Sequence, residues 1–229
     1  MQPPFESHPM IRQFNELKKY FRHYETKVSR DRIRKFRSYA REIEAETGTP
    51  VAFDFLGSVN FGQAMDGSDV DMVIYIAGAD HEDECTLEEC PIVQEIRSHL
   101  LRLVSAHTDD EPYTIEVLDC INLNLLAREL ETGDHNSHML MRFAVYRSLC
   151  RLVNPLLIRP YQKKLKANQE LIERMSVDIQ LVLDNLVHSS RHNLSFKKYR
   201  ERIQDAGVRI PDPILRAIRG HLENRDKPE

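Results

Sequence analysis

Hydrophobic positions near the start of the chain recur at helical spacing and predict two helices. Pro9 suits a first helical turn, and the apolar positions after it lie three or four residues apart. A second helix is expected to begin with Ser29 as its N-cap and to stop at Gly48. The apolar faces are Ile11, Phe14, Leu17 and Phe21 in the first helix, and Ile33, Phe36, Tyr39, Ala40 and Ile43 in the second.

The pattern then changes from helical spacing to short runs of β-forming residues. Strands are expected at 51–56, 69–76 and 113–118, with a helix at 87–104. Past Asn122 nearly all of the chain returns to helical spacing. Breaks are expected near Gly133, at Pro155 and Pro160, near Asn193 and at 207–213. The pattern therefore predicts an α+β fold with a helical C-terminal half.

Length and composition limit the classes of protein to which the chain can belong. With 229 residues and 41% hydrophobic side chains, it can bury a core in one domain or two small ones. No apolar run approaches the about 18 to 20 residues that a membrane span needs, and residues 1–6 lack the profile of a signal peptide. The four cysteines have neither disulfide-framework nor zinc-finger spacing. We therefore expect a soluble, cytoplasmic protein with no membrane partner.

Charge is strongly segregated along the chain, although the net charge is only −4. Residues 1–50 carry 11 basic and 7 acidic side chains, residues 51–135 carry 3 and 19, and residues 136–229 carry 18 and 10. The acidic middle region has two interpretations. It can be a solvated surface, which accounts for most of 80–89 and 109–111, or it can hold carboxylates that bind a metal ion.

The segment 56–72 combines a glycine-serine pair with two closely spaced acids. A strand that ends in Gly57 and Ser58 lets a phosphate approach the backbone, where the hydroxyl and the amides can donate hydrogen bonds. Asp69 and Asp71 follow on the next strand, where residues two apart face the same side. Such acids repel each other unless a cation lies between them, and Mg²⁺ prefers oxygen ligands. We therefore expect a metal site with Mg²⁺ as the cofactor, and with Mn²⁺ as a substitute.

A third carboxylate should come from a neighbouring strand, and Glu116 is the preferred candidate. It lies between Ile115 and Val117, where an acid is unfavourable unless it is paired or binds metal. The alternative is an ordinary alternating strand in which Glu116 faces solvent. Asp119 is expected on the opposite face if the strand stays regular.

Together these residues resemble the signature of the polymerase-beta-like nucleotidyltransferase superfamily. That signature is a Gly-Ser pair, here Gly57-Ser58, a spacer of about ten residues, and Asp-x-Asp on a strand, here Asp69 and Asp71. Gly62, Ser68 and the segment 115–119 further resemble the bacterial minimal nucleotidyltransferases. The resemblance covers residues 50–125. It departs from the family pattern at Glu116, where Asp is commoner.

The resemblance implies a small mixed β-sheet core flanked by helices, with three regions. Residues 1–49 would be helices that pack on the core, residues 50–135 the nucleotidyltransferase core, and residues 136–229 a helical C-terminal region. The implied activity is the transfer of a nucleoside monophosphate from a nucleoside triphosphate, such as ATP, to an acceptor hydroxyl by a two-metal mechanism. The implied catalytic residues and metal ligands are Asp69, Asp71 and Glu116, and the implied nucleotide-binding residues are Gly57, Ser58 and Ser68. Glu116 would either accept a proton or only hold a metal.

Basic side chains from the helical half are expected to neutralise the triphosphate. Lys163 and Lys164 are the predicted nucleotide-binding residues, and Lys166, Arg142, Arg147 and Arg151 are further candidates. The acceptor stays open among an RNA, a protein hydroxyl and a small molecule.

A second class of function stays open beside the enzyme. The chain can be a catalytically inactive nucleotidyltransferase-fold protein that binds a nucleotide or a protein partner, as an antitoxin-like regulatory protein would. Glu116 buried in an ion pair away from Asp69 and Asp71 would favour this alternative, whereas retention of all three carboxylates beside Gly57 and Ser58 favours the enzyme.

Overall fold

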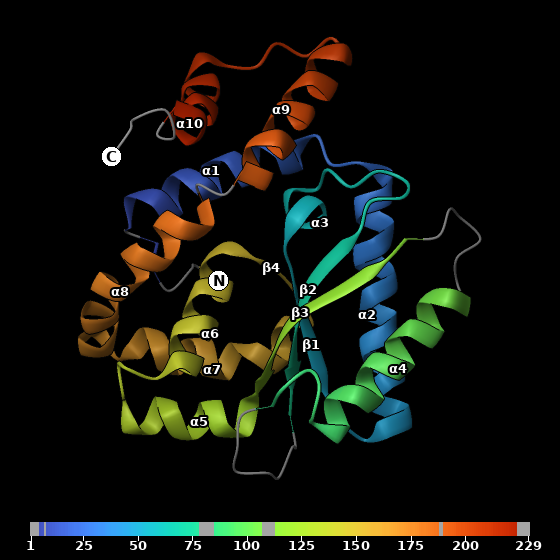
Figure 1. The fold of residues 1–229 in the computed structure, drawn as a ribbon, viewed down its shortest axis with the longest axis vertical. Helices are drawn as coiled ribbons and strands as arrows, with labels where there is room; N and C mark the ends of the chain where they lie inside the picture. The colour runs from blue at the N-terminus through green and yellow to red at the C-terminus, as the bar shows by residue number, and fades with distance from the viewer. Residues whose placement is uncertain (1–4, 7, 78–84, 107–112, 188–189, 224–229) are drawn as a thin grey trace.

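The computed structural model describes residues 5–6, 8–77, 85–106, 113–187 and 190–223 (Figure 1). Residues 80–84 and 109–111 of the expected acidic surface lie outside this part of the chain. Within it, the elements in chain order are α1 (Pro9–His23), α2 (Lys27–Thr47), β1 (Val51–Phe55), α3 (Gly57–Phe61), β2 (Val70–Ile76), α4 (Pro91–Ala106), β3 (Ile115–Asn122), α5 (Leu123–Thr132), α6 (His138–Leu149), β4 (Arg151–Val153), α7 (Pro155–Ala167), α8 (Gln169–Val187), α9 (Ser190–Asp205) and α10 (Asp212–Glu223).

The strands form one mixed sheet in the order β3-β2-β1-β4. β1 is antiparallel to both β2 and β4, whereas β3 is parallel to β2. This arrangement confirms the expected α+β class, with a small mixed sheet and a helical C-terminal half. The helical spacing past Asn122 does not predict β4, because three residues between two helices are too few to display an alternating pattern.

Helices cover both faces of the sheet (Figure 1). α2 and α4 pack against one face through side chains such as Phe36 and Ile96. The other face packs on α1 and on helices of the C-terminal half, with Phe14 and Phe143 among the contacts. All five residues of β1 are buried, as expected for a central strand that is covered on both sides. The first two helices of the chain therefore lie on opposite faces of the sheet.

Helix termini follow local capping signals, with three corrections to the predicted boundaries. α1 begins at Pro9, and Gly48 ends α2 with a φ of 71°, both as predicted. The N-cap of α2 is Thr26 rather than Ser29, because the Thr26 side chain accepts a 3.1 Å hydrogen bond from the Ser29 amide. Pro160 lies inside α7 and Asn193 inside α9, so neither residue ends a helix.

The four cysteines are reduced in the structure, as their spacing predicts. Cys85, Cys90, Cys120 and Cys150 are all buried and none forms a disulfide. Burial raises the pKa of the Cys150 thiol well above its usual range, so this thiol stays protonated. Among the helices of the described residues, none is long and apolar enough to cross a membrane.

Candidate active site

The glycine at the end of β1 lies against a carboxylate. β1 ends beside the start of β2, where the Leu56 amide donates a 2.9 Å hydrogen bond to the Asp71 carbonyl. Gly57 then adopts a φ of +53°, and a Cβ atom at this position would collide with Asp71 Oδ2. Only glycine meets both conditions without strain, because an L side chain disfavours positive φ. The close approach expected at Gly57 therefore has a definite neighbour within the protein, the Asp71 carboxylate.

Asp71 and Glu116 are direct neighbours across β2 and β3. The parallel register pairs these two residues, and paired residues project from the same face of a sheet. Asp69 immediately precedes β2 and accepts a hydrogen bond from the hydroxyl of Thr114, which immediately precedes β3. Asp69 and Glu116 are exposed, and Asp71 is half-buried. The structure thus gathers the three predicted carboxylates at one end of the sheet.

These carboxylates do not converge on a single point as they stand. No group of three or more His, Cys, Asp or Glu side chains within the described ranges is arranged to hold a metal ion. The donor chemistry nevertheless suits Mg²⁺, which binds carboxylate oxygens. Asp69 and Glu116 are exposed and can change rotamer without disturbing a core. Coulomb repulsion between neighbouring carboxylates favours splayed rotamers until a cation offsets it.

A bulge in β3 alters the expected position of Asp119. The pairing of β2 with β3 shifts so that Leu118 has no partner and Asp119 pairs with Val73. The extra residue reverses the alternation along the strand, so Asp119 faces the same side as Glu116 and not the opposite side. There Asp119 Oδ2 accepts a 2.8 Å hydrogen bond from the Tyr146 hydroxyl. Asp119 is therefore bound to α6. Glu116 remains the candidate for the third carboxylate beside Asp69 and Asp71.

The two serines predicted to bind the nucleotide have different surroundings. Ser58 lies in the first turn of α3, is half-buried, and has no hydrogen-bond partner for its hydroxyl among the described residues. Ser68 Oγ accepts a 3.0 Å hydrogen bond from the Met65 amide and closes the turn that leads to Asp69. Arg32 holds the same turn, since its Nη1 donates a 2.6 Å hydrogen bond to the Ser68 carbonyl. Ser58 is thus available to a ligand, whereas Ser68 shapes the loop.

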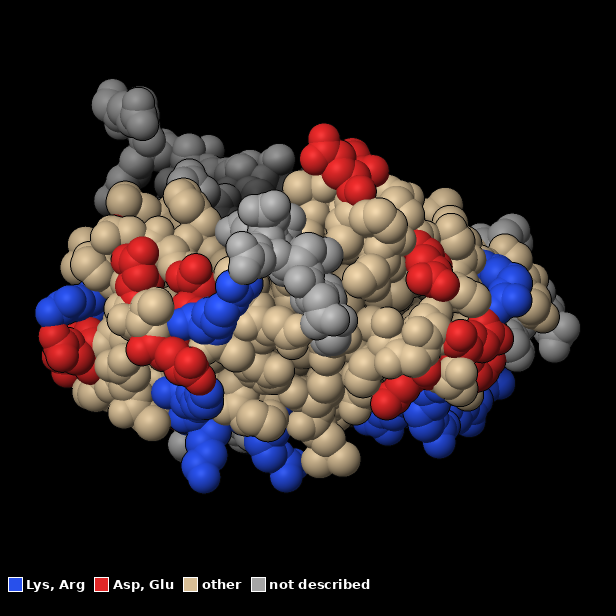
Figure 2. All heavy atoms as spheres, turned by 90° about the horizontal axis from the view of Figure 1, so that it is seen from below, with Lys and Arg blue, Asp and Glu red and all other residues tan. Residues whose placement is uncertain are grey.

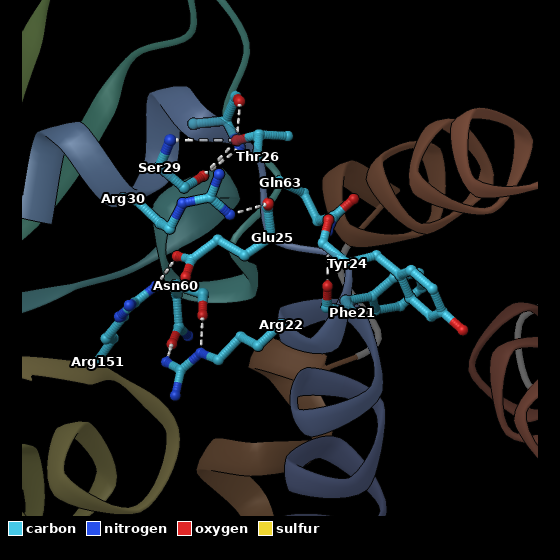
Figure 3. Close-up of polar contacts among 11 residues, drawn as sticks. Phe21, Arg22, Tyr24, Glu25, Thr26, Ser29, Arg30, Asn60, Gln63 and Arg151 are labelled. Atoms are coloured by element: carbon cyan, nitrogen blue, oxygen red, sulfur yellow. Dashed lines mark hydrogen bonds and ion pairs between the residues drawn. The ribbon is translucent and has the colours of Figure 1, made fainter. Parts of the chain in front are cut away.

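The corner between α1 and α2 holds the loop that follows α3 (Figure 3). The Thr26 amide donates to the Gly62 carbonyl at 3.0 Å, and the Thr26 hydroxyl donates to the Ala64 carbonyl at 2.6 Å. The Ser29 hydroxyl accepts a 2.8 Å hydrogen bond from the Ala64 amide. Gln63 Nε2 donates to two carbonyl groups at the end of α1, at 2.7 and 3.1 Å. The spacer of the signature is therefore held in one conformation by contacts to its backbone.

The three arginines considered as triphosphate ligands form ion pairs within the protein. Their partners are Asp119 for Arg142, Asp54 for Arg147, and Glu25 for Arg151. Asp54 is 0% exposed, so its pair with Arg147 lies in the core. These guanidinium groups neutralise carboxylates that the fold itself contains, and this structural role accounts for their presence in the helical half.

Lys163 and Lys164 lie on α7, away from the carboxylates. Lys164 Nζ pairs with Glu131 Oε1 at 2.9 Å, near the end of α5, and Lys163 is exposed. α5 follows the C-terminal end of β3, whereas Glu116 lies near its start, so the length of a strand separates the two places. On the face around α5, basic and acidic side chains are interspersed (Figure 2). The structure does not bring the two predicted lysines to the carboxylates.

Helix α9 forms a wall of the candidate site that the sequence pattern does not predict. The Tyr199 ring lies 5.8 Å from the Phe61 ring of α3. Burial, with a smaller contribution from the Asp71 carboxylate, raises the pKa of Tyr199 to about 12. Arg202 Nη1 donates a 3.0 Å hydrogen bond to the Gln63 carbonyl, and its Nη2 is buried without a partner among the described residues. Arg202 therefore brings an incompletely satisfied positive charge to the loop of the signature.

One signal in the sequence could have identified Arg202. It lies three residues after Tyr199 and directly before Ile203, on the side of α9 that packs inward, where a basic residue is unusual.

Comparison of the chain with family models, with curated proteins and with solved structures found no match.

Proposed function

We propose that the chain is a nucleotidyltransferase of the polymerase-beta-like superfamily, which transfers a nucleoside monophosphate from a nucleoside triphosphate to an acceptor hydroxyl. The register of β2 and β3 carries the proposal, because it sets Asp71 beside Glu116 with Asp69 at the same end of the sheet. Like charges directly opposite each other on a sheet destabilise the fold. A role in ligand binding accounts for their presence, whereas folding alone does not.

Each residue of the candidate site has a chemical role in this proposal. Asp69, Asp71 and Glu116 would hold two Mg²⁺ ions, for which Mn²⁺ could substitute. Such ions supply charge stabilisation at both ends of an in-line displacement at phosphorus. The Ser58 hydroxyl donates a hydrogen bond to a phosphate oxygen, and the absence of a side chain at Gly57 lets the Asp71 carboxylate lie against the backbone beside it. Glu116 either accepts the proton of the acceptor hydroxyl or only holds a metal.

Arg202 replaces Lys163 and Lys164 in our assignment of the basic residue that neutralises the triphosphate. Unlike Arg142, Arg147 and Arg151, it has no carboxylate partner among the described residues, so its charge is left for an anionic ligand. Its Nη1 group binds the Gln63 carbonyl, which places Arg202 on the loop between the glycine-serine pair and the carboxylates. We expect Arg202→Gln to weaken triphosphate binding more than Lys163→Gln does.

The alternative of a binding protein without activity has less support. That alternative calls for Glu116 in a buried ion pair away from the two aspartates. Glu116 is exposed, is the register neighbour of Asp71, and forms no ion pair within the described part of the chain. This environment suits a metal ligand or a base better than a structural residue.

Incubation with each labelled nucleoside triphosphate and Mg²⁺ tests the proposal. We expect release of pyrophosphate, and a rise in melting temperature on addition of metal and nucleotide by mass action. Asp69→Asn combined with Asp71→Asn should abolish both responses. Asp178→Asn combined with Asp205→Asn is the control, since it removes two exposed carboxylates elsewhere on the surface. A wild-type protein that shows neither response with any triphosphate would contradict the proposal.

Ser58→Ala probes the phosphate contact alone. We expect it to weaken triphosphate binding by about 1 to 3 kcal/mol, the usual contribution of a hydrogen bond to a charged group. Stability should change little, because the hydroxyl has no partner among the described residues. Isothermal titration provides the measurement, with Ser98→Ala on α4 as the control. Equal affinity in the wild type and in Ser58→Ala would refute this role of the hydroxyl.

A further inference from the structure

The N-terminal half of α2 concentrates positive charge at the same end of the sheet as the carboxylates. Residues 27–41 contain one acidic residue, Asp31, and seven basic ones, whereas residues 42–47 contain three Glu and no basic residue. The basic residues are Lys27, Arg30, Arg32, Arg34, Lys35, Arg37 and Arg41. α2 starts at the end of the sheet where α3 lies and runs toward the opposite end (Figure 1). Its basic half therefore lies at the same end of the sheet as the candidate site, on the face opposite to the one from which Asp71 and Glu116 project.

A cavity of about 340 Å³ lies beside this half of α2. Its lining residues are Lys27, Val28, Asp31, Arg32 and Lys35 of α2, together with Asp66 and Tyr113. Asp66 belongs to the loop that leads to Asp69, and Tyr113 precedes β3. The volume falls within the range of about 300 to 1,000 Å³ that is usual for ligand pockets. The cavity is thus of ligand size and is built partly from the two segments that lead to the carboxylates.

Arg32 connects the cavity to the candidate site. Its guanidinium lies 4.2 Å from the centre of the Tyr113 ring, and its Nη1 binds the Ser68 carbonyl at 2.6 Å. Burial lowers the pKa of Arg32, and Asp66 and Asp69 are among the groups that oppose this shift. The wall formed by Arg32 and Tyr113 is therefore in electrostatic contact with one of the carboxylates of the site.

The polar groups of the cavity match the two functional groups of a ribonucleotide backbone. Lys27 and Lys35 are separated by about 12 Å along the helix, at a rise of about 1.5 Å per residue, and can each face a phosphate. Asp66 is exposed, and its carboxylate can accept hydrogen bonds from ribose hydroxyls. Asp31 Oδ1 is paired with Arg34 at 2.7 Å, which offsets its repulsion of an anion. Deoxyribose lacks the 2′-hydroxyl that a carboxylate in this position would recognise.

We propose that this cavity and the basic half of α2 bind single-stranded RNA. A terminal hydroxyl of that RNA would be the acceptor, and this acceptor role rests on the proposed function, whereas RNA binding does not. The carboxylates project from the face that α2 does not cover, but β3 is an edge strand and Glu116 is exposed, so an acceptor bound at α2 can reach them around the β3 edge. The side of α3 and α9 is left for the triphosphate, as an in-line displacement requires. The proposed acceptor path thus runs along α2.

Direct binding measurements without triphosphate test the proposal. Labelled single-stranded RNA of about ten nucleotides, and DNA of the same sequence, are titrated with protein at several salt concentrations and followed by fluorescence anisotropy. The test variant is Lys27→Glu with Lys35→Glu. The matched control is Arg128→Glu with Arg159→Glu, which makes the same change in net charge at exposed positions of α5 and α7. Lys27→Gln with Lys35→Gln serves as a milder variant, and melting temperatures verify that every variant folds.

We expect the wild type to prefer RNA to DNA. The Lys27 and Lys35 reversal should weaken RNA binding at least tenfold at low salt, and reduce the slope of log affinity against log salt by about 2. The control should change affinity less than about twofold. Asp66→Asn should reduce the preference for RNA over DNA. Equal losses in the test variant and the control, no RNA binding by the wild type, or equal affinity for RNA and DNA would each overturn the proposal.

The same experiment separates this inference from the proposed function. RNA binding that needs Lys27 and Lys35, in a protein that releases no pyrophosphate with any triphosphate, would leave the RNA site in place and remove the transferase assignment. Pyrophosphate release without RNA binding would do the opposite.

Discussion

Two sets of acidic side chains on the same face of the sheet have opposite surroundings. Asp54 in β1 is fully buried, pairs with Arg147, and accepts a 2.6 Å hydrogen bond from the Tyr75 hydroxyl. Asp69 and Glu116, at the open end of β2 and β3, are exposed, and Glu116 has no ion pair among the described residues. Buried charge is expensive unless it is enclosed with its counter-charge. The carboxylate in the core is therefore neutralised inside the protein, whereas the exposed carboxylates are those that we propose for ligand binding.

The buried pair of Asp54 and Arg147 should matter more for stability than the exposed carboxylates do. Arg147→Met tests this. Removal of the guanidinium leaves Asp54 buried without its counter-charge, so we expect a loss of about 3 to 5 kcal/mol in the free energy of unfolding. Urea denaturation provides the measurement. Arg147→Met combined with Asp54→Leu should recover most of the loss, because no charge then stays buried. A loss below about 1 kcal/mol in the single variant would show that the buried pair is not structural.

Gly57→Ala should introduce strain at the open end of the sheet, beside the Asp71 carboxylate. The new Cβ would collide with the Asp71 carboxylate at a φ of +53°, and we expect a loss of about 2 to 4 kcal/mol in stability. Gly48→Ala is the matched control, since its φ is +71° but nothing lies within 4 Å of its added Cβ. It should lose only about 1 kcal/mol in the same thermal or urea unfolding experiment.

The double variant Gly57→Ala with Asp71→Ala isolates the contact with the carboxylate. If the collision causes the extra loss, removal of the Asp71 side chain should restore stability to about the level of the Gly48→Ala control. No recovery would mean that the strain arises from φ alone.

Lys18→Met tests a buried ammonium that neighbours Asp54. Lys18 Nζ donates a 2.6 Å hydrogen bond to the Leu149 carbonyl, and burial, assisted by Arg22, lowers the pKa of Lys18 to about 7. The unfolded chain then holds more protons than the folded chain between about pH 7 and the ordinary pKa of lysine, so stability rises with pH across that window. We expect Lys18→Met to be about 1 to 2 kcal/mol more stable than the wild type at pH 6. Its advantage should shrink by pH 9.

Urea denaturation at the two pH values measures this effect. The Leu149 carbonyl keeps a 2.9 Å hydrogen bond from Asn60 Nδ2 in the variant, so the substitution leaves no buried acceptor without a partner. An advantage for Lys18→Met that does not vary with pH would indicate better packing rather than a buried charge.

Glu116→Gln should have the smallest effect on the fold. The side chain is exposed and without an ion pair among the described residues, so we expect a change within about 0.5 kcal/mol in stability. The rise in melting temperature on addition of Mg²⁺ and a triphosphate should nevertheless fall to a small fraction of the wild-type value. A large loss of stability would mean that Glu116, like Asp54, contributes to folding.

Local patterns in the sequence predict most of the fold. The glycine and proline signals around α1 and α2, and the β-forming runs of β1 to β3, each depend on residues close in sequence. The boundary errors have a different cause. Ser29 is a plausible N-cap, but its hydroxyl accepts a hydrogen bond from Ala64, which lies far along the chain. β4 exists because β1 offers it a partner, and no pattern within three residues can predict that pairing.

The residues of the candidate site also fall into two groups, those that the local sequence predicts and those that only the tertiary structure brings together. Gly57, Ser58 and the two aspartates are close in sequence and form a recognisable motif, so their position at one end of the sheet could be predicted. The bulge at Leu118 depends on how β3 pairs with β2, and it reverses the expected direction of Asp119. The contact of Arg202 with Gln63 joins residues 139 positions apart. Basic residues are common in helices, and composition does not tell which of them the fold brings to the site.

The packing of α9 on α3 has a consequence for folding during synthesis of the chain. The Phe61 and Phe196 rings lie 5.1 Å apart, and Phe196 belongs to the penultimate helix of the chain. Ribosomes synthesise the N-terminal part first, at about 5 to 20 residues per second. For several seconds a nascent chain holds β1 to β3 and all three carboxylates while Phe61 has its ring contacts with Phe14 and Phe21 of α1 but lacks those of α9. The growing polypeptide therefore exposes part of the apolar surface of α3, and this surface is covered only when α9 has been made.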